Sequence, residues 1–129
     1  MLKAINPPGA AWPGISMGIL GKGSGLFVSS GHVGADENGE IVTSSLEDQI
    51  VALFEGLGRT LKAAGLGFEH VARTTYYVTN YEPALVETLR KVRSRYLNQE
   101  TPPASVLVGI TALYDPRIRV EAEVIAVTP

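Results

Sequence analysis

Cysteine is absent from this chain of 129 residues. Its absence excludes disulfide bonds, thiolate metal ligands and a cysteine nucleophile. Histidine is also scarce, because His32 and His70 are the only two and they do not form a His-x-x-x-His pair. The sequence therefore predicts no metal site.

Long apolar runs are missing as well. No segment approaches the ~20 apolar residues of a membrane-spanning helix, and residues 1–8 lack the apolar core of a signal peptide. We therefore expect a soluble, cytoplasmic protein with no membrane partner.

An excess of positive charge is the third absence. The net charge is −2 and the pI is near 5.6, whereas a nucleic-acid-binding domain is normally strongly basic. One basic cluster exists, and its helical spacing favours a solvated helix face over a phosphate-binding track. Its members are Arg90, Lys91, Arg93 and Arg95. We expect no nucleic-acid partner.

What is present fits one globular domain over residues 1–129. Apolar residues make up 45% of the chain and charged residues 19%, which is a globular and not a disordered composition. The first third is rich in glycine. Its short apolar runs, 17–20 and 26–29, flank the glycines of 21–25 and predict a β-hairpin. A turn at 36–39 and a short extended piece at 40–42 follow.

The most regular segment is a predicted helix that starts near Ser44 or Ser45. Apolar residues recur there at three- and four-residue steps up to position 64. A capping box suits its start, and Gly65 suits its end. Gly56 and Gly58 inside the helix predict that another group packs close to the backbone.

The second half predicts an α+β arrangement. β-Branched and aromatic residues favour a strand over 71–79, a helix follows Pro83 and ends within 98–103, and strands are expected at 105–111 and 118–127. The last strand alternates apolar residues with Arg117, Arg119, Glu121 and Glu123. Two helices can cover only one face of a sheet, so the charged face is expected to meet solvent or another subunit.

Five segments occur in order along nearly the whole chain: LFVSSGHV at 26–33, the helix with Gln49 that ends in AAG at 63–65, VARTTYYVT at 71–79, PPAS at 102–105 and VEAEVIAV at 120–127. In this order and spacing they resemble the Rid/YjgF family of reactive-intermediate deaminases. The resemblance implies a chorismate-mutase-like fold, in which a mixed sheet packs two helices on one face. It also implies a homotrimer with a barrel-like core and ligand clefts between subunits.

The resemblance further implies hydrolysis of small imines or enamines without any cofactor. Position by position, the glutamate that positions the hydrolytic water corresponds to Glu121. The family's tyrosine and glutamine positions hold Ile15 and His32. The arginine that clamps the substrate carboxylate is replaced by Ser105.

From these residues we predict a binding and catalytic site. Glu121 would polarise water, His32 would move a proton, and the amides near Ser30-Gly31 and Ser105-Val106 would bind an oxygen anion. The alternatives are purely structural: Glu121 would form a salt bridge with Arg119 or Arg73, and His32 would cap or pack.

Serine cannot replace the bidentate fork of an arginine, which leaves three explanations. Arg73 or Arg119 takes over the carboxylate, the substrate has no carboxylate there, or the protein binds without catalysis; we favour the second narrowly. The predicted function is deamination of an imine or enamine other than the usual 2-imino acids. The alternative is a metabolite-binding, regulatory trimer.

Overall fold

The computed structural model describes residues 1–9 and 12–129. The elements are, in order, β1 (Leu2–Ile5), β2 (Gly18–Gly21), β3 (Gly25–Val28), β4 (His32–Val33), α1 (Leu46–Ala63), a 3-10 turn (Phe68–His70), β5 (Val71–Val78), α2 (Pro83–Arg93), β6 (Ala104–Gly109) and β7 (Val120–Thr128). Neither helix of these described ranges has the length and apolar character needed to cross a membrane.

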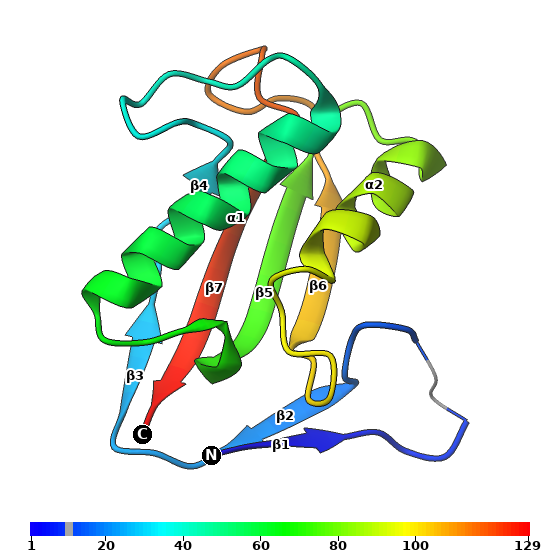
Figure 1. The fold of residues 1–129 in the computed structure, drawn as a ribbon. Coiled ribbons are helices and arrows are strands. Elements are labelled where there is room, and N and C mark those ends of the chain that lie inside the picture. Colours follow the sequence, from blue (N-terminus) through cyan, green and yellow to red (C-terminus); the bar gives the residue numbers. More distant parts are fainter. Residues whose placement is uncertain (10–11) are drawn as a thin grey trace.

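The main sheet has the strand order β3-β7-β5-β6, and β4 pairs with β7 beyond the end of β3. Strands β5 and β6 are parallel, while β7 is antiparallel to its neighbours. Helix α2 provides the crossover that a parallel pair requires. Both helices cover the same face (Figure 1), which confirms the predicted mixed sheet with two helices on one side.

Strand β7 lies at the centre of this sheet and alternates as expected. Val120, Ala122, Val124 and Ala126 are buried under the helices. Glu121 and Glu123 lie between them and are only partly buried, on the opposite face. We call that opposite face the outer face.

Helix α1 begins after the predicted Ser45 and ends before the predicted Gly65, but only one half of the predicted capping box forms, because Asp48 Oδ2 accepts from the Ser44 hydroxyl. The Ser45 side chain accepts a hydrogen bond of 3.0 Å from the Asp48 amide. Gly65 adopts a φ of +75° and donates to Lys62 O, which closes the last turn. Glycine inside the helix is explained at Gly58, where an added Cβ would lie 3.3 Å from the Phe68 ring.

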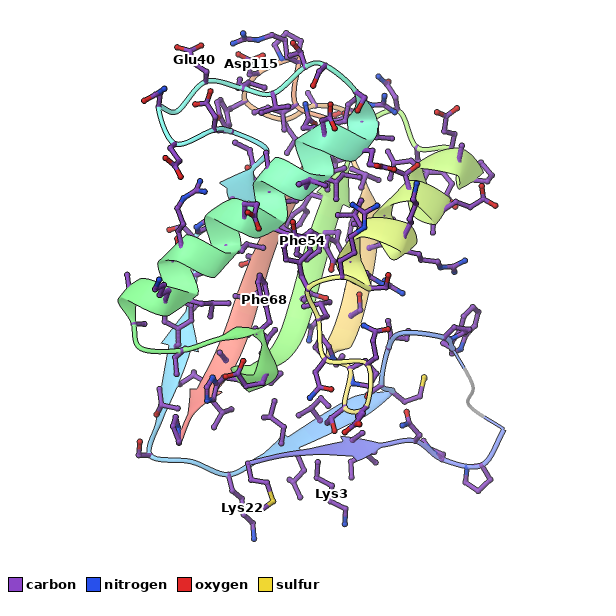
Figure 2. The ribbon with its side chains drawn as sticks, viewed as in Figure 1. Lys3, Lys22, Glu40, Phe54, Phe68 and Asp115 are labelled. Carbon is purple, nitrogen blue, oxygen red and sulfur yellow. The ribbon has the colours of Figure 1, made fainter. Side chains whose placement is uncertain are left out.

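An aromatic cluster fills the space between the two helices and the sheet. Phe54 stacks on Tyr96 with ring centroids 5.2 Å apart, and Phe68 and Tyr76 lie against Phe54. Phe54 and Phe68 project from α1 and the 3-10 turn toward the same region (Figure 2). Helix α2 itself ends at Arg93, earlier than predicted, but Tyr96 in the following turn still packs in the core.

The predicted N-terminal hairpin is wrong. Strand β2 pairs with β1, a strand that was not predicted, and β3 pairs with β7 in the main sheet. The glycines between β2 and β3 allow a close approach to the end of β7, because a Cβ at Gly23 would lie 1.9 Å from Thr128 O. The 40–42 segment makes only one isolated bridge, between Ile41 and Ala35.

A buried amide ties α1 to two loops. Gln49 is 3% exposed, and its Nε2 donates to Val42 O and Arg117 O at 2.9 Å each. Its Oε1 accepts from the Arg119 amide at 2.8 Å. The Gln49 side chain thus provides the hydrogen-bond partner for three backbone groups, the carbonyls of Val42 and Arg117 and the amide of Arg119.

We expect Gln49→Leu to lower the free energy of unfolding by about 3 kcal/mol, because it keeps the volume but leaves buried backbone groups without partners. Urea unfolding followed by circular dichroism measures this loss. The exposed Glu87→Gln on α2 is the control, expected to change stability by less than about 0.5 kcal/mol. Equal midpoints for the two variants would contradict the role of Gln49.

Candidate functional site

The first group of predicted site residues lies where β4 meets β7. Val33 pairs with Glu121 and His32 with Ala122, so the loop residues Ser30 and Gly31 lie beside the Glu121 side chain. A Cβ built on Gly31 would stand 2.6 Å from Glu121 Oε2. The Glu121 carboxylate therefore lies directly against the Gly31 backbone, in space that only glycine leaves open.

The Glu121 carboxylate forms no hydrogen bond or ion pair with any residue of the described ranges. Its cross-strand neighbour is Tyr77, whose hydroxyl donates to Glu123 Oε1 at 2.5 Å. The pKa of Tyr77 is raised above its usual value of 10.0, mainly by that hydrogen bond and to a smaller extent by partial burial. The outer face thus holds two carboxylates, and only Glu123 has an internal donor. The Glu121 salt bridge to Arg73 or Arg119 is not formed within one chain.

His32 uses both of its ring nitrogens inside the chain. Nδ1 lies 2.9 Å from Ser30 O, and Nε2 lies 2.7 Å from Oγ1 of Thr60 on α1. The ring lies close to α1 at Gly56, where an added Cβ would make an ordinary contact of 3.9 Å with His32 Cδ2. The imidazole therefore links the loop that carries Gly31 to helix α1, and it holds the conformation of that loop.

The second group lies at the start of β6, two strands away from β7. Ile15, Arg73, Ser105 and Val106 line a hollow of about 220 Å³ together with Trp12. The chain before β2 is held there by Ser16, whose hydroxyl donates to Pro102 O at 2.5 Å and whose amide donates to Pro103 O at 3.2 Å. These bonds place the Ile15 position directly beside Ser105.

Arg119 belongs to neither group. Its Nε and Nη2 donate to Thr79 O at 3.3 Å and to Asn80 O at 3.1 Å. Asn80 has a positive φ of 49°, so the guanidinium stabilises the turn that follows β5. Arg73 lies near the start of the same strand. Of the two predicted replacement cations, only Arg73 is near Ser105.

Sequence reasoning missed Arg93, which the structure places beside Ser105. Lys91 and Arg95 do face outward, where they pair with Glu47 at 2.8 and 3.6 Å. Arg93 instead turns toward the sheet and donates to Pro13 O at 3.2 Å. Partial burial lowers the pKa of its guanidinium from the usual value. The prediction of a fully solvated basic face is therefore wrong for Arg93.

A signal for Arg93 was available in the helical period. It follows the buried Leu89 by four residues, which places it on the same side of the helix. Gly14 provides the space above it, because a Cβ there would lie 3.1 Å from Arg93 Nη2.

The two groups do not meet within one chain. Strands β7 and β6 flank β5, which separates them by about 10 Å. Register adds a second separation: Ser105 pairs with the buried Thr74 and faces the helices, whereas Glu121 faces outward. In the part of the chain that the structure describes, no cluster of three or more metal-ligating side chains occurs.

These features define a small α+β protein whose mixed sheet is covered by two helices on one face only (Figure 1). A family model described as endoribonuclease L-PSP matches residues 19–128. The chain therefore belongs to this family, the Rid/YjgF family, as its resemblance predicted.

Individual relatives are distant but cover most of the chain. YyfB of Yersinia pestis, a Rid-family protein of unknown function, has a solved structure with a TM-score of 0.86, 26% identity and 98% coverage of both chains. A Lactococcus lactis protein, provisionally named the regulator AldR, is 29% identical over 98% of this chain and 95% of its own. Reactive Intermediate Deaminase A of Arabidopsis thaliana is 27% identical over 78% of this chain and 53% of its own.

Two glycines give a matched test of the Glu121 environment. Neither has a left-handed φ, so alanine tests contact alone. We expect Gly31→Ala to cost less than about 1 kcal/mol, because the displaced atom is the flexible end of Glu121. We expect Gly34→Ala to cost about 3 kcal/mol or more, because its Cβ would lie 2.1 Å from backbone Gln49 O.

Thermal unfolding measures both costs, and a crystal structure of the Gly31→Ala variant should show the Glu121 carboxylate moved away from the loop. An unmoved carboxylate, or equal destabilisation by the two alanines, would contradict this description of the contact.

Proposed function

We propose that the protein is a cofactor-free deaminase that hydrolyses a small imine or enamine in clefts between the subunits of a homotrimer. The observation that supports this most strongly is the division of the site. Glu121 with Ser30 and Gly31 lies on one side of the sheet, and Ser105 with Ile15 lies toward the other edge. Each group alone offers either a base or a binding wall, so a complete site requires two subunits.

Exposed apolar residues support such an assembly. Val106 and Val108 on the outer face of β6 are 36% and 38% exposed, and Leu26 and Val28 on the edge strand β3 are 67% and 60% exposed. A closed threefold ring would join the β3 and β4 edge of one subunit to the β6 edge of the next. That contact would cover these side chains and bring Glu121 to the neighbouring Ser105.

The proposed reaction needs few groups. Glu121 accepts a proton as water adds to the C=N carbon, and the nitrogen takes up a proton to give a carbinolamine. The C–N bond then breaks as the hydroxyl loses its proton, which yields a carbonyl compound and ammonia. Amides near Ser30-Gly31 and Ser105-Val106 stabilise the developing oxygen anion. His32 acts by holding the loop that carries Ser30 and Gly31. Proton transfer by its ring, predicted from sequence, is a second proposed role.

The substrate differs from the usual 2-imino acids in this proposal, because Ser105 offers no charged fork. The name of the Arabidopsis relative supports deamination. The regulatory name of the Lactococcus relative supports the alternative, a trimer that binds a metabolite without turnover. Cleavage of RNA is disfavoured by the net charge of −2 and by the two carboxylates on the outer face.

We expect a homotrimer in solution. Light scattering at micromolar concentration should give the mass of three 13.7 kDa chains. The double variant Val106→Lys and Val108→Lys should dissociate it, because each lysine puts charge into the proposed apolar contact. A stable mass of one chain for the unmodified protein would overturn the assembly.

We expect Glu121→Gln to lower turnover by about 100-fold, because the amide keeps the shape but cannot accept the proton. A panel of imines that are not 2-imino acids, generated from primary amines by amine oxidases, measures the change, with ammonia release as the readout. Melting temperature and trimer mass should stay nearly the same as for Glu87→Gln, the surface control.

Unchanged turnover in Glu121→Gln would remove this residue from the reaction. Absence of turnover across the panel by the unmodified protein would favour the metabolite-binding alternative. Loss of the trimer together with activity would make Glu121 an interface residue.

A further inference from the structure

A second cavity lies behind Ser105, on the helix side of the sheet. It measures about 150 Å³ and lies between α2, β6 and the chain before β2. Its principal lining residues are Trp12, Ile15, Tyr76, Leu89, Arg93 and Ser105. It shares Trp12, Ile15 and Ser105 with the hollow described above, so the two spaces adjoin.

The charge of this cavity is positive and uncompensated. Arg93 carries five N–H donors, and one of its atoms, Nη2, donates to Pro13 O. It forms no ion pair with any carboxylate within residues 1–9 and 12–129. Arg90 also borders the cavity, and the lining contains no acidic residue. A partly buried guanidinium of this kind is a receptor for an anion.

An independent feature of the same cavity is a buried hydroxyl without a partner. Tyr76 is 1% exposed, and its hydroxyl forms no hydrogen bond within the described chain. Burial raises the pKa of Tyr76, and the nearby Thr74 hydroxyl opposes that rise. The Thr74 hydroxyl is likewise buried without a hydrogen-bond partner, so the two do not pair with good geometry. An unpaired buried hydroxyl costs free energy, and a bound acceptor would remove that cost.

We propose that this cavity binds the carboxylate of a small organic acid, with Arg93 as its cation and the Tyr76 and Ser105 hydroxyls as further donors. The volume equals that of roughly five water molecules, which suits a carboxylate with a short carbon chain. Trp12 and Leu89 provide the apolar contact for that chain.

This assignment supplies a cation other than Arg73 or Arg119. A side chain at position 105 would hold a carboxylate at β6, whereas Arg93 holds it from α2. The acid group is therefore displaced from the place where an arginine at 105 would bind it. The identification of this acid as the substrate rests on the proposed deaminase function, but the binding itself does not.

Butanoate and butanamide are suitable probes, because they have the same size and only butanoate is charged. Binding is measured by titration, with the fluorescence of Trp12, the single tryptophan, and the heat recorded by calorimetry as two readouts. We expect butanoate to bind at millimolar concentration and butanamide at least about 10-fold more weakly.

Three variants separate the roles. Arg93→Met should weaken butanoate binding by about 10-fold or more, and Arg95→Met, which removes an outward-facing arginine of the same helix, should not change it. Tyr76→Phe should weaken binding by about 3-fold or more without lowering the melting temperature, because it removes an unpaired hydroxyl. A purely structural tyrosine would show the reverse pattern.

Equal binding of the two probes, no binding of butanoate at tens of millimolar, or unchanged binding by Arg93→Met would each overturn the assignment. Failure of the proposed deaminase function looks different: butanoate would still bind through Arg93 while no imine of the panel is hydrolysed.

Discussion

The architecture depends on the two unlike faces of strand β7. Its apolar side chains must be covered, and α1 and α2 cover them. Its carboxylates cannot enter that core, because burial of an unpaired charge is strongly unfavourable. The strand pairs with β3, β4 and β5, so its alternation decides which way the side chains of its neighbours point. The half-covered sheet follows from this one strand.

The same alternation separates the chemistry of the protein into two layers. Glu121 lies on the outer face with its carboxylate against Gly31, where water can reach it. Ser105 and Arg93 lie on the helix side. A general base benefits from access to water, and an anion-binding guanidinium benefits from partial removal from water. Each group therefore has the surroundings that suit the role proposed for it.

The parts of the fold that were predictable are those with a local period. Helix α1, strand β5 and the two faces of β7 follow from spacing alone, because one buried side imposes a repeat of 3.6 or 2 residues. The partner of a strand has no such local signal. Strands β2 and β3 were both recognised, but pairing them with each other was wrong, because the glycines between them serve contact with β7 and not a hairpin.

The candidate site was predictable only in part, for the same reason: contacts between distant residues leave no local signal. The contact of Glu121 with Gly31 joins residues far apart in sequence, and it was approached only through resemblance to a family. Arg119 carries the right charge, but its guanidinium is used by backbone carbonyls after β5, which no sequence pattern records. Arg93 was missed because a charged residue at the flank of an apolar stripe looks solvated until the opposing loop, with Gly14, is placed.

The attachment of Ser16 to the start of β6 has a consequence for folding. β6 is the edge strand of the main sheet, and its start is covered by a segment that precedes it by 86 positions, as the bond to Pro102 shows. Pairing across such a distance forms late in folding. A chain whose sheet has formed but whose first segment is still detached would leave the start of β6 as a free strand edge, which is the type of surface that recruits strands from other molecules. In the folded chain, the bonds of Ser16 to Pro102 and Pro103 cover the start of this edge.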